Sequence, residues 1–401
     1  MSKTSLATSR SAARPSLWTP PFVTLALATL AYFTGDGILI AAIPRFVAGP
    51  LGGGAVAVGV VVGAFSVSAF FLRPWVGGLG DRRGRRLLML LGAGLFAVSV
   101  LGYPLTSDPA TLTVLRLLTG AGEACFFVGV VTAFTDLAPP ERRGEAMSLA
   151  SLALYVGIGI GPLLGELAID RLGFTAAWLL AAACGLVALT MALRVPETRP
   201  TAMLGQADAP RHRLVHPAGM VPGLVLLASI LGMAGFLAFV PLYALDLGMS
   251  GSRFVLLVFS GVVVAIRTLG ARIPDRIGPA TATRLALALS ATGLALAGIW
   301  RSPAGLVTGA VVLGAGIALL TPAVFALAVQ RAAPDERGSV IGTVSAFLDI
   351  AFGVGPVTLG FVGASLGYPG TFLASAAVAA TGLVMVLVTR LGRQPSAARR
   401  R

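Results

Sequence analysis

The chain has 401 residues, of which 56% are hydrophobic and only 11% are charged. Soluble domains are about 25% charged, so this low fraction excludes a cytosolic enzyme, a disordered scaffold and a simple nucleic-acid binder. The formal net charge is +14, from 30 Lys and Arg residues against 16 Asp and Glu residues. Such a surplus is typical of proteins that contact nucleic acid or a membrane surface, and the positions of the arginines decide between the two.

Apolar runs long enough to cross a bilayer follow one another along the chain. A membrane-spanning helix needs about 20 mainly apolar residues, and the sequence predicts twelve such spans joined by short connections. The expected fold class is therefore an all-α membrane protein with no separate soluble domain. The predicted spans are 21–47, 54–80, 86–106, 109–137, 144–169, 173–194, 220–246, 253–275, 281–300, 303–330, 338–365 and 368–390.

The longest and most polar connection, after the sixth span, divides the chain into two predicted six-helix bundles. The first apolar run continues to Val47 with no early cleavage site, so we interpret it as a retained helix and not as a signal peptide. The expected parts are a cytoplasmic tail at 1–20, a first bundle at 21–195, a cytoplasmic linker at 196–219, a second bundle at 220–391 and a basic cytoplasmic tail at 392–401.

The basic residues predict the orientation of these spans. Twenty-five of the 30 lysines and arginines fall on the tails, the linker and the loops that would share the cytoplasmic side. Cytoplasmic loops of membrane proteins carry such an excess, and it contacts anionic lipid headgroups. We therefore expect a protein of the cytoplasmic (inner) membrane with both termini in the cytoplasm, and no nucleic-acid partner is needed to explain the charge. The four arginines expected outside are Arg45, Arg171, Arg253 and Arg301.

The second half of the chain repeats the first at a single offset of 194 residues. Two parallel six-helix repeats are an architecture of secondary transporters, in which the substrate site lies between the repeats near the middle of the bilayer. The repeat therefore predicts a two-bundle transporter. The offset pairs Arg73 with Arg267, Asp81 with Asp275, Gly120 with Gly314, Gly161 with Gly355 and Leu172 with Leu366.

A glycine- and arginine-rich loop joins the second and third predicted spans. It reads Gly77-Gly78-Leu79-Gly80-Asp81-Arg82-Arg83-Gly84-Arg85-Arg86. Its glycines allow a tight turn, and Asp81 is placed to accept hydrogen bonds from a neighbouring helix N-terminus. With the repeat, this loop resembles the signature loop of the major facilitator superfamily, and the resemblance covers the whole chain.

The resemblance implies a gating role for this loop, which in the superfamily latches the two halves together in the outward-open state. The second copy of the loop is degraded, with Ala271 in place of the first glycine and Pro279 in place of a basic residue. The residues to which the resemblance assigns the gate are Gly77, Asp81, Arg82, Gly84, Arg85 and, in the second copy, Asp275.

The fifth predicted span contains closely spaced glycines followed by a proline. Small residues four apart let helices approach closely, and a proline bends a helix. The run Gly157-Ile158-Gly159-Ile160-Gly161-Pro162-Leu163-Leu164-Gly165 resembles the antiporter signature of the superfamily's drug:proton exporters, with Glu166 in place of the last glycine. A phosphate-binding loop is excluded because such loops follow a strand and open a helix. Packing alone is the alternative for Gly157, Gly161, Pro162 and Gly165.

Charged residues within the predicted spans are candidates for function because a charge inside a membrane is costly. Repeated charges, such as that of Arg73, are assigned to the shared scaffold and gate. Among the charges with no counterpart in the other half, four stand out at or above mid-helix and are the candidates for proton coupling or substrate binding. They are Asp36, Arg116, Glu123 and Asp349.

The fourth predicted span places Arg116 and Glu123 on nearly the same helix face. The run from Arg116 to Gly122 resembles the superfamily's helix-4 motif, whose arginine is proposed to assist proton transfer, with Thr119 in place of the usual glutamine. In the superfamily the first, fourth, seventh and tenth spans line the central cavity, which implies that Asp36 and Glu123 face it. A structural ion pair between Arg116 and Glu123 is the alternative.

A buried carboxyl group resists ionisation, whereas a nearby guanidinium favours it, so an acid in the cavity can exchange a proton as the cavity opens to either side. A cationic substrate would then compete with that proton. The alternative for Asp36 and Asp349 is a structural role, in which each forms hydrogen bonds with a neighbouring helix. We expect Tyr32 and Phe127 to stack on a drug-like substrate, although packing roles are an equal alternative.

The function expected from these observations is proton-coupled efflux of small amphipathic drugs or metabolites by alternating access. The alternative is a transporter of sugars or other polar metabolites, which is weaker because the cavity-lining spans hold few Asn, Gln or Trp residues. No cluster of His, Cys or paired acids points to an enzyme, a metal or a cofactor. The expected partners are a small molecule, protons and the bilayer, with the chain as a monomer.

Overall fold

The computed structural model describes residues 17–199, 216–270, 276–330 and 336–389, and this part of the chain is helical with no strand. Both tails, most of the expected linker with His212, and Asp275 lie outside the described residues. The helices of the first half are α1 (Pro20–Ala48), α2 (Ala55–Arg83), α3 (Arg85–Leu101), α4 (Pro109–Leu137), α5 (Arg143–Leu172) and α6 (Phe174–Arg194). Those of the second half are α7 (Pro217–Asp246), α8 (Arg253–Leu269), α10 (Pro279–Ile299), α11 (Pro303–Val329) and α12 (Arg337–Val388).

The predicted all-α membrane fold is confirmed, since ten of the described helices are long and apolar enough to cross a membrane. The structure does not reproduce twelve separate spans, because α8 has only 17 described residues and two predicted spans join in the 52-residue α12. Within α12, Gly367 has φ 68° and ψ −178°, a backbone conformation open to glycine. The predicted ranges 338–365 and 368–390 are the segments on either side of this break.

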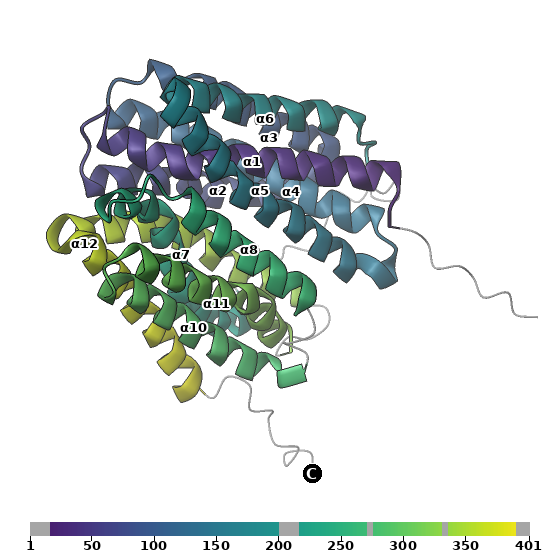
Figure 1. Cartoon of the computed structure of the whole chain (residues 1–401). Helices are drawn as coiled ribbons and strands as arrows, with labels where there is room; N and C mark the ends of the chain where they lie inside the picture. The colour runs from purple at the N-terminus through teal and green to yellow at the C-terminus, as the bar shows by residue number, and fades with distance from the viewer. Residues whose placement is uncertain (1–16, 200–215, 271–275, 331–335, 390–401) are drawn as a thin grey trace, which may run out of the picture.

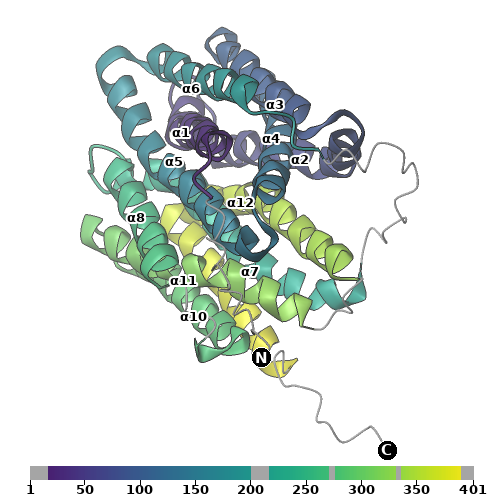
Figure 2. The same cartoon turned by 90° about the vertical axis from the view of Figure 1, so that its right-hand side faces the viewer.

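The helices of the two halves form two groups that lie side by side (Figure 1). In the first group α1 packs against α5 and α6, and α3 packs against α4; Figure 2 shows α1 nearly end-on, close to α5 and α6. In the second group α7 packs against α12, and α10 against α11. The groups meet mainly through two helix pairs, α2 with α12 and α5 with α8, which the 194-residue offset relates to each other.

The repeat extends to the way in which equivalent helices begin. Asp108 caps α4 by accepting hydrogen bonds from the backbone amides of Ala110 (2.8 Å) and Thr111 (2.9 Å). At the same offset Ser302 caps α11 through the amide of Gly305 (3.1 Å). Such caps satisfy amides that have no partner within the helix. The hydrogen bonds from the Thr111 hydroxyl and the two amides also lower the pKa of Asp108, which lies outside the spans.

The two groups are in backbone contact at one end of the molecule. We call the end at which α1 begins (Pro20) the tail face and the end at which it finishes (Ala48) the far face. Near the far face, a Cβ atom at Gly59 of α2 would overlap the carbonyl oxygen of Pro356, and one at Gly63 would overlap that of Gly353. Only glycine permits this approach, so these residues fix the α2–α12 contact.

A buried carboxylate closes the α5–α8 pair at the same far face. Glu166 is fully buried and accepts hydrogen bonds from the backbone amides of Ser252 (2.7 Å) and Arg253 (3.0 Å), and from the Ser252 hydroxyl (2.7 Å). These amides open α8, where the helix dipole favours a negative charge. Asp170 of α5 adds ion pairs to Arg253 (2.9 Å) and to Arg45 of α1 (3.2 Å).

The antiporter-like run packs α5 against α1. A Cβ atom at Gly161 would come within 2.5 Å of the Gly37 Cα atom, and one at Gly165 within 3.1 Å of the Ile38 side chain. Gly157 likewise faces the α1 backbone around Thr34. Gly157, Gly161 and Gly165 therefore have a packing role in the first group, and an antiport role for the run stays a prediction.

Candidate functional site

A cavity of about 310 Å³ lies between the two helix groups. Its wall is mainly aliphatic and aromatic, with side chains from α1, α2, α4, α5, α7, α8, α11 and α12. A largely apolar cavity with a few charged groups is typical of a small-molecule site. The ionisable residues that line it are Asp36, Arg73, Glu123, Tyr155, Arg267 and Asp349.

Arg73 joins two of the predicted acids across the interface between the groups. One Nη atom lies 3.3 Å from Oε1 of Glu123 on α4 and 3.0 Å from Oδ1 of Asp349 on α12. The Arg73 guanidinium also lies 5.1 Å from the centre of the Phe127 ring. The carboxylates are only 9% and 6% exposed as side chains, and separating a buried pair leaves an uncompensated charge. The contact between α2 and α12 therefore includes a buried ion pair, so separating these two helices would change the charges in the cavity.

Asp36 lines the same cavity without an ion pair or hydrogen bond to any described residue. The glycines on either side of it hold α1 close to its neighbours, because a Cβ atom would lie 3.0 Å from the Ala181 carbonyl oxygen at Gly35 and from the Gly157 carbonyl oxygen at Gly37. The half-buried carboxylate between them faces the cavity and is available to a proton or a cation.

Arg116 lies behind the cavity wall, and its ion pair with Glu123 is not among the contacts of the described residues. It is 5% exposed, its Nε donates to the Val61 carbonyl oxygen at 3.4 Å, and its guanidinium lies 4.8 Å from the Phe65 ring centre. Both partners belong to α2, so Arg116 holds α4 against α2. The partner of Glu123 is Arg73, which sequence reasoning had assigned to the scaffold.

The two predicted aromatic residues occupy different places. Phe127 lines the cavity, whereas Tyr32 is 1% exposed and stacks on Phe126 with ring centres 4.0 Å apart. Thr119, which replaces the glutamine of the helix-4 motif, lies 2.6 Å from the Tyr103 hydroxyl and 3.0 Å from that of Ser99. Tyr32 and Thr119 thus help to pack the first group.

The signature loop is held within the first group. Asp81 is 63% exposed and pairs with Arg85 at 2.9 Å, and Arg85 also lies 3.4 Å from Asp136. Gly84 turns the chain with φ 101°. The amides of Arg85 and Arg86 at the start of α3 donate to Glu197 at 2.9 and 3.2 Å. Glu197 therefore caps α3, whereas Asp81, which we expected to accept hydrogen bonds from a neighbouring helix N-terminus, pairs with the Arg85 side chain among the described residues.

The remaining gate residues make few contacts. The Arg82 carbonyl oxygen accepts a hydrogen bond from the Arg199 side chain, and a Cβ atom at Gly77 would meet no atom of the described neighbours within 4 Å. Asp275 lies outside the described residues, so its predicted role is untested.

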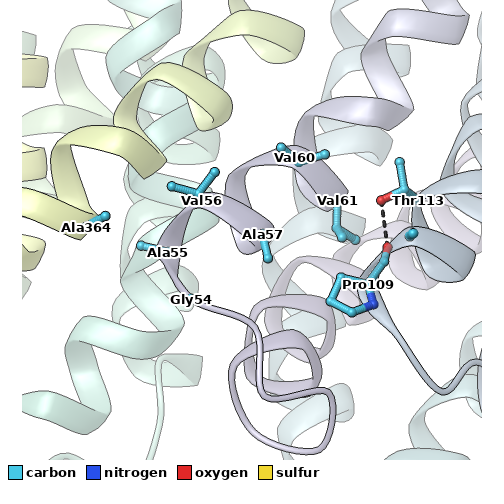
Figure 3. Close-up of a pocket in the computed structure, with 10 residues that line it drawn as sticks. Gly54, Ala55, Val56, Ala57, Val60, Val61, Pro109, Thr113 and Ala364 are labelled. Carbon is cyan, nitrogen blue, oxygen red and sulfur yellow. Dashed lines mark hydrogen bonds between the residues drawn. The ribbon is translucent and has the colours of Figure 1, made fainter.

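A second hollow opens at the far face beside the first turns of α2 and α4 (Figure 3). It is lined by residues such as Val56, Val60 and Pro109, with Ala364 of α12 at its edge, and the Thr113 hydroxyl donates to the Pro109 carbonyl oxygen at 2.7 Å. None of its lining residues is ionisable. The central cavity is therefore the candidate site.

Three residues of functional interest were missed by sequence reasoning: Arg73, Arg267 and Glu166. The two arginines are charges within spans, but because each repeats the other they were assigned to the shared scaffold and gate. Glu166 stood out only as a departure from the glycine of the antiporter-like motif.

The sequence matches the family model described as Major Facilitator Superfamily over residues 25–303 and 275–401. An uncharacterized MFS-type transporter of Salmonella typhimurium is 30% identical over 87% of this chain and 91% of its own length. The uncharacterized MFS-type transporter YhhS of Escherichia coli is 25% identical over 93% of each chain.

Solved transporter structures share the fold. A bacterial homologue of the human lysosomal transporter Spinster, in an inward-facing and occupied conformation, has a TM-score of 0.75 at 14% identity and covers 92% of this chain and 96% of its own. The human organic anion transporter MFSD10 has a TM-score of 0.68 at 20% identity, over 92% of this chain and 100% of its own.

Proposed function

The chain belongs to the major facilitator superfamily, whose members carry small molecules across membranes, and from this premise we propose that it is a proton-coupled exporter. In this proposal it exchanges protons for small amphipathic drugs or metabolites by alternating access. The tail face is cytoplasmic, in keeping with the excess of arginine there. The chain works as a monomer in the cytoplasmic membrane.

The observation that carries the proposal is the set of carboxylates in an otherwise apolar cavity. Glu123 and Asp349 share Arg73, whereas Asp36 has no partner among the described residues. Acids inside a membrane are costly and mark proton pathways. In this proposal the protonation of these three acids changes with the side to which the cavity is open, and this change couples the proton to substrate movement.

The Arg73 triad supplies a way to couple proton binding to movement. Opening the far face requires α2 to leave α12, which separates Arg73 from Asp349. An unpaired carboxylate in an apolar wall is costly while ionised, so Asp349 takes up a proton from the far side when the pair breaks. Closing the far face restores the pair and releases the proton toward the tail face. Export then follows because substrate enters from the tail face after the proton has been released there.

The cavity wall argues against the alternative of a sugar or other polar metabolite. Sugar sites rely on amide and indole side chains, and none of the described residues that line the cavity is Asn, Gln or Trp. The many aliphatic and aromatic side chains favour a substrate with an apolar body.

Substitution of the cavity acids tests the proposal. Asp36→Asn and Glu123→Gln remove two of the three acids on which the proposed exchange depends, so each should abolish proton movement driven by substrate in proteoliposomes while the protein still folds. The measurement is the change of an internal pH dye after addition of anionic and cationic amphipathic dyes. Glu145→Gln is the matched control, since this acid is 50% exposed and pairs with Arg142 outside the cavity. Unchanged coupling in both cavity variants would rule out the assignment.

A further inference from the structure

The cavity holds two arginines at equivalent positions of the repeat, and their surroundings differ. Arg73 on α2 and Arg267 on α8 are related by the offset of 194 residues and both line the cavity. Each guanidinium lies over an aromatic ring, that of Phe127 at 5.1 Å for Arg73 and that of Tyr155 at 4.6 Å for Arg267. Only Arg73 has carboxylate partners among the described residues.

The offset explains the difference residue by residue. The two acids that pair with Arg73 are Glu123 and Asp349, and their counterparts in the other half are Ile317 and Tyr155. Where the first arginine meets two negative charges, the second has an aliphatic side chain and an aromatic ring at the equivalent positions. The contact of Arg267 with Tyr155 joins α8 to α5, just as that of Arg73 with Asp349 joins α2 to α12.

The positive charge of Arg267 is thus uncompensated by any described residue. No carboxylate oxygen of the described residues lies within 4.0 Å of its nitrogens, and its buried Nε has no hydrogen-bond acceptor. The other acids of the wall do not serve it, because Glu123 and Asp349 are engaged by Arg73 and Asp36 makes no ion pair. A buried charged donor without an acceptor is unfavourable, which a bound anion would relieve.

The guanidinium group matches one class of ligand in particular. It presents donors in a planar fork that bonds a carboxylate through two parallel hydrogen bonds. The Tyr155 ring supports one face of the guanidinium. Apolar residues such as Phe33, Phe259 and Phe352 line the same cavity and suit the apolar body of such a ligand.

We propose that Arg267 binds the carboxylate group of the transported compound, with Tyr155 positioning the guanidinium, so that the substrates are amphipathic organic anions. This inference rests on the proposed function only in taking the central cavity as the substrate site. Asp36, the unpaired acid, then remains available to a proton while the substrate occupies Arg267.

Binding of three matched probes to the purified full-length protein tests the assignment. The probes are 2-naphthoate, 2-naphthamide and 2-naphthylmethylammonium, which share a ring system and differ in charge; affinity is measured by calorimetry in detergent. The wild-type protein should bind the carboxylate most tightly. Arg267→Gln should weaken binding of 2-naphthoate by about 10- to 100-fold, the worth of a hydrogen-bonded charge pair, and leave the amide unchanged.

Further variants separate recognition from loss of structure. Arg267→Lys should keep part of the preference for the carboxylate, since it keeps the charge without the fork. Tyr155→Leu removes the ring that supports the guanidinium and should weaken binding of the carboxylate probe alone. Arg301→Gln removes the same charge from an exposed connection before α11 and should change nothing. Thermal unfolding and size exclusion check the fold of each variant.

Different results would overturn the anion site and the proton-coupled mechanism. Equal binding of 2-naphthoate by the wild type and Arg267→Gln, or a wild type that prefers the ammonium probe or binds none of the three, overturns the anion site. Proton coupling that depends on Asp36 and Glu123 would still stand in those cases. Binding through Arg267 without substrate-driven proton movement would instead support the anion site and overturn the proton-coupled mechanism.

Discussion

The two ends of the α2–α12 contact differ in how closely the helices approach. At the far face, Gly59 and Gly63 bring α2 into backbone contact with α12. At the tail face, side chains built at Gly77 or Gly78 of α2, or at Gly342 of α12, would meet no described atom within 4 Å. This pair of helices is therefore in backbone contact at the far face, whereas the glycines at its tail end make no such contact with the described residues.

The α5–α8 pair shows the same asymmetry by other means. Its far end is closed by Glu166 at the start of α8 and by the ion pairs of Asp170. The α2–α12 closure thus depends on glycines, which have no side chain, and the α5–α8 closure depends on the buried carboxylate of Glu166. Alternating access requires both to open together, so each offers a separate way to shift the balance between the two states.

The largest effect is expected from a side chain in the backbone contact. Gly59→Leu places atoms where the Pro356 carbonyl oxygen lies, and overpacking of this kind costs about 1–3 kcal/mol or more. The far face should fail to close and transport should be lost. The test uses a cysteine introduced at the cavity residue Ala238 in a protein without Cys125 and Cys184. The rate at which a thiol reagent added on the far side labels this cysteine should rise by about 100-fold.

Gly78→Leu is the matched control for this variant, because no described atom lies within 4 Å of its Cβ position. It should be labelled from the far side as the parent protein is. Equal labelling of the Gly59 and Gly78 variants would show that the α2–α12 contact does not close the cavity.

A smaller effect is expected from neutralising the buried carboxylate of the second closure. Glu166→Gln keeps the shape but loses the charge that accepts hydrogen bonds from Ser252 and Arg253. Hydrogen bonds to charged groups contribute about 1.5–3 kcal/mol, part of which the amide oxygen retains, so labelling from the far side should rise about tenfold. If labelling falls or stays constant, Glu166 does not hold the far face shut.

The smallest effect on this conformation is expected at the tail face. Asp81 is 63% exposed and pairs only with Arg85 among the described residues, and exposed pairs contribute about 0–1 kcal/mol. Asp81→Asn should leave labelling and substrate affinity nearly constant while slowing turnover, because the resemblance places its role in the opposite state. The measurement is kcat and KM for transport in proteoliposomes. A loss of affinity alone would contradict a gating role.

Hydrophobic runs and the cost of buried charge account for what the sequence predicted well. The helices follow the predicted ranges because each bilayer crossing needs a long apolar segment, and Asp36, Glu123 and Asp349 line the cavity because an acid in a span needs a polar environment. Their partners were not predictable in this way. A helix that is apolar on all sides has no polar face to fix its rotation, so the sequence did not distinguish Tyr32, which is packed, from Phe127, which lines the cavity.

The start of the predicted linker has a mechanical consequence. Glu197 binds the amides that open α3, and the Arg199 side chain binds the Arg82 carbonyl oxygen. At the other end, the His216 amide donates to Thr343 of α12 at 2.8 Å. The connection between the halves therefore leaves the first group at the signature loop and not at the end of α6. The number of residues from Arg199 to His216 sets an upper limit of about 60 Å on the distance that this connection can span. A force between the two halves would therefore act on the signature loop and on the first turns of α12. These are the two parts of the molecule that must come together when the tail face closes.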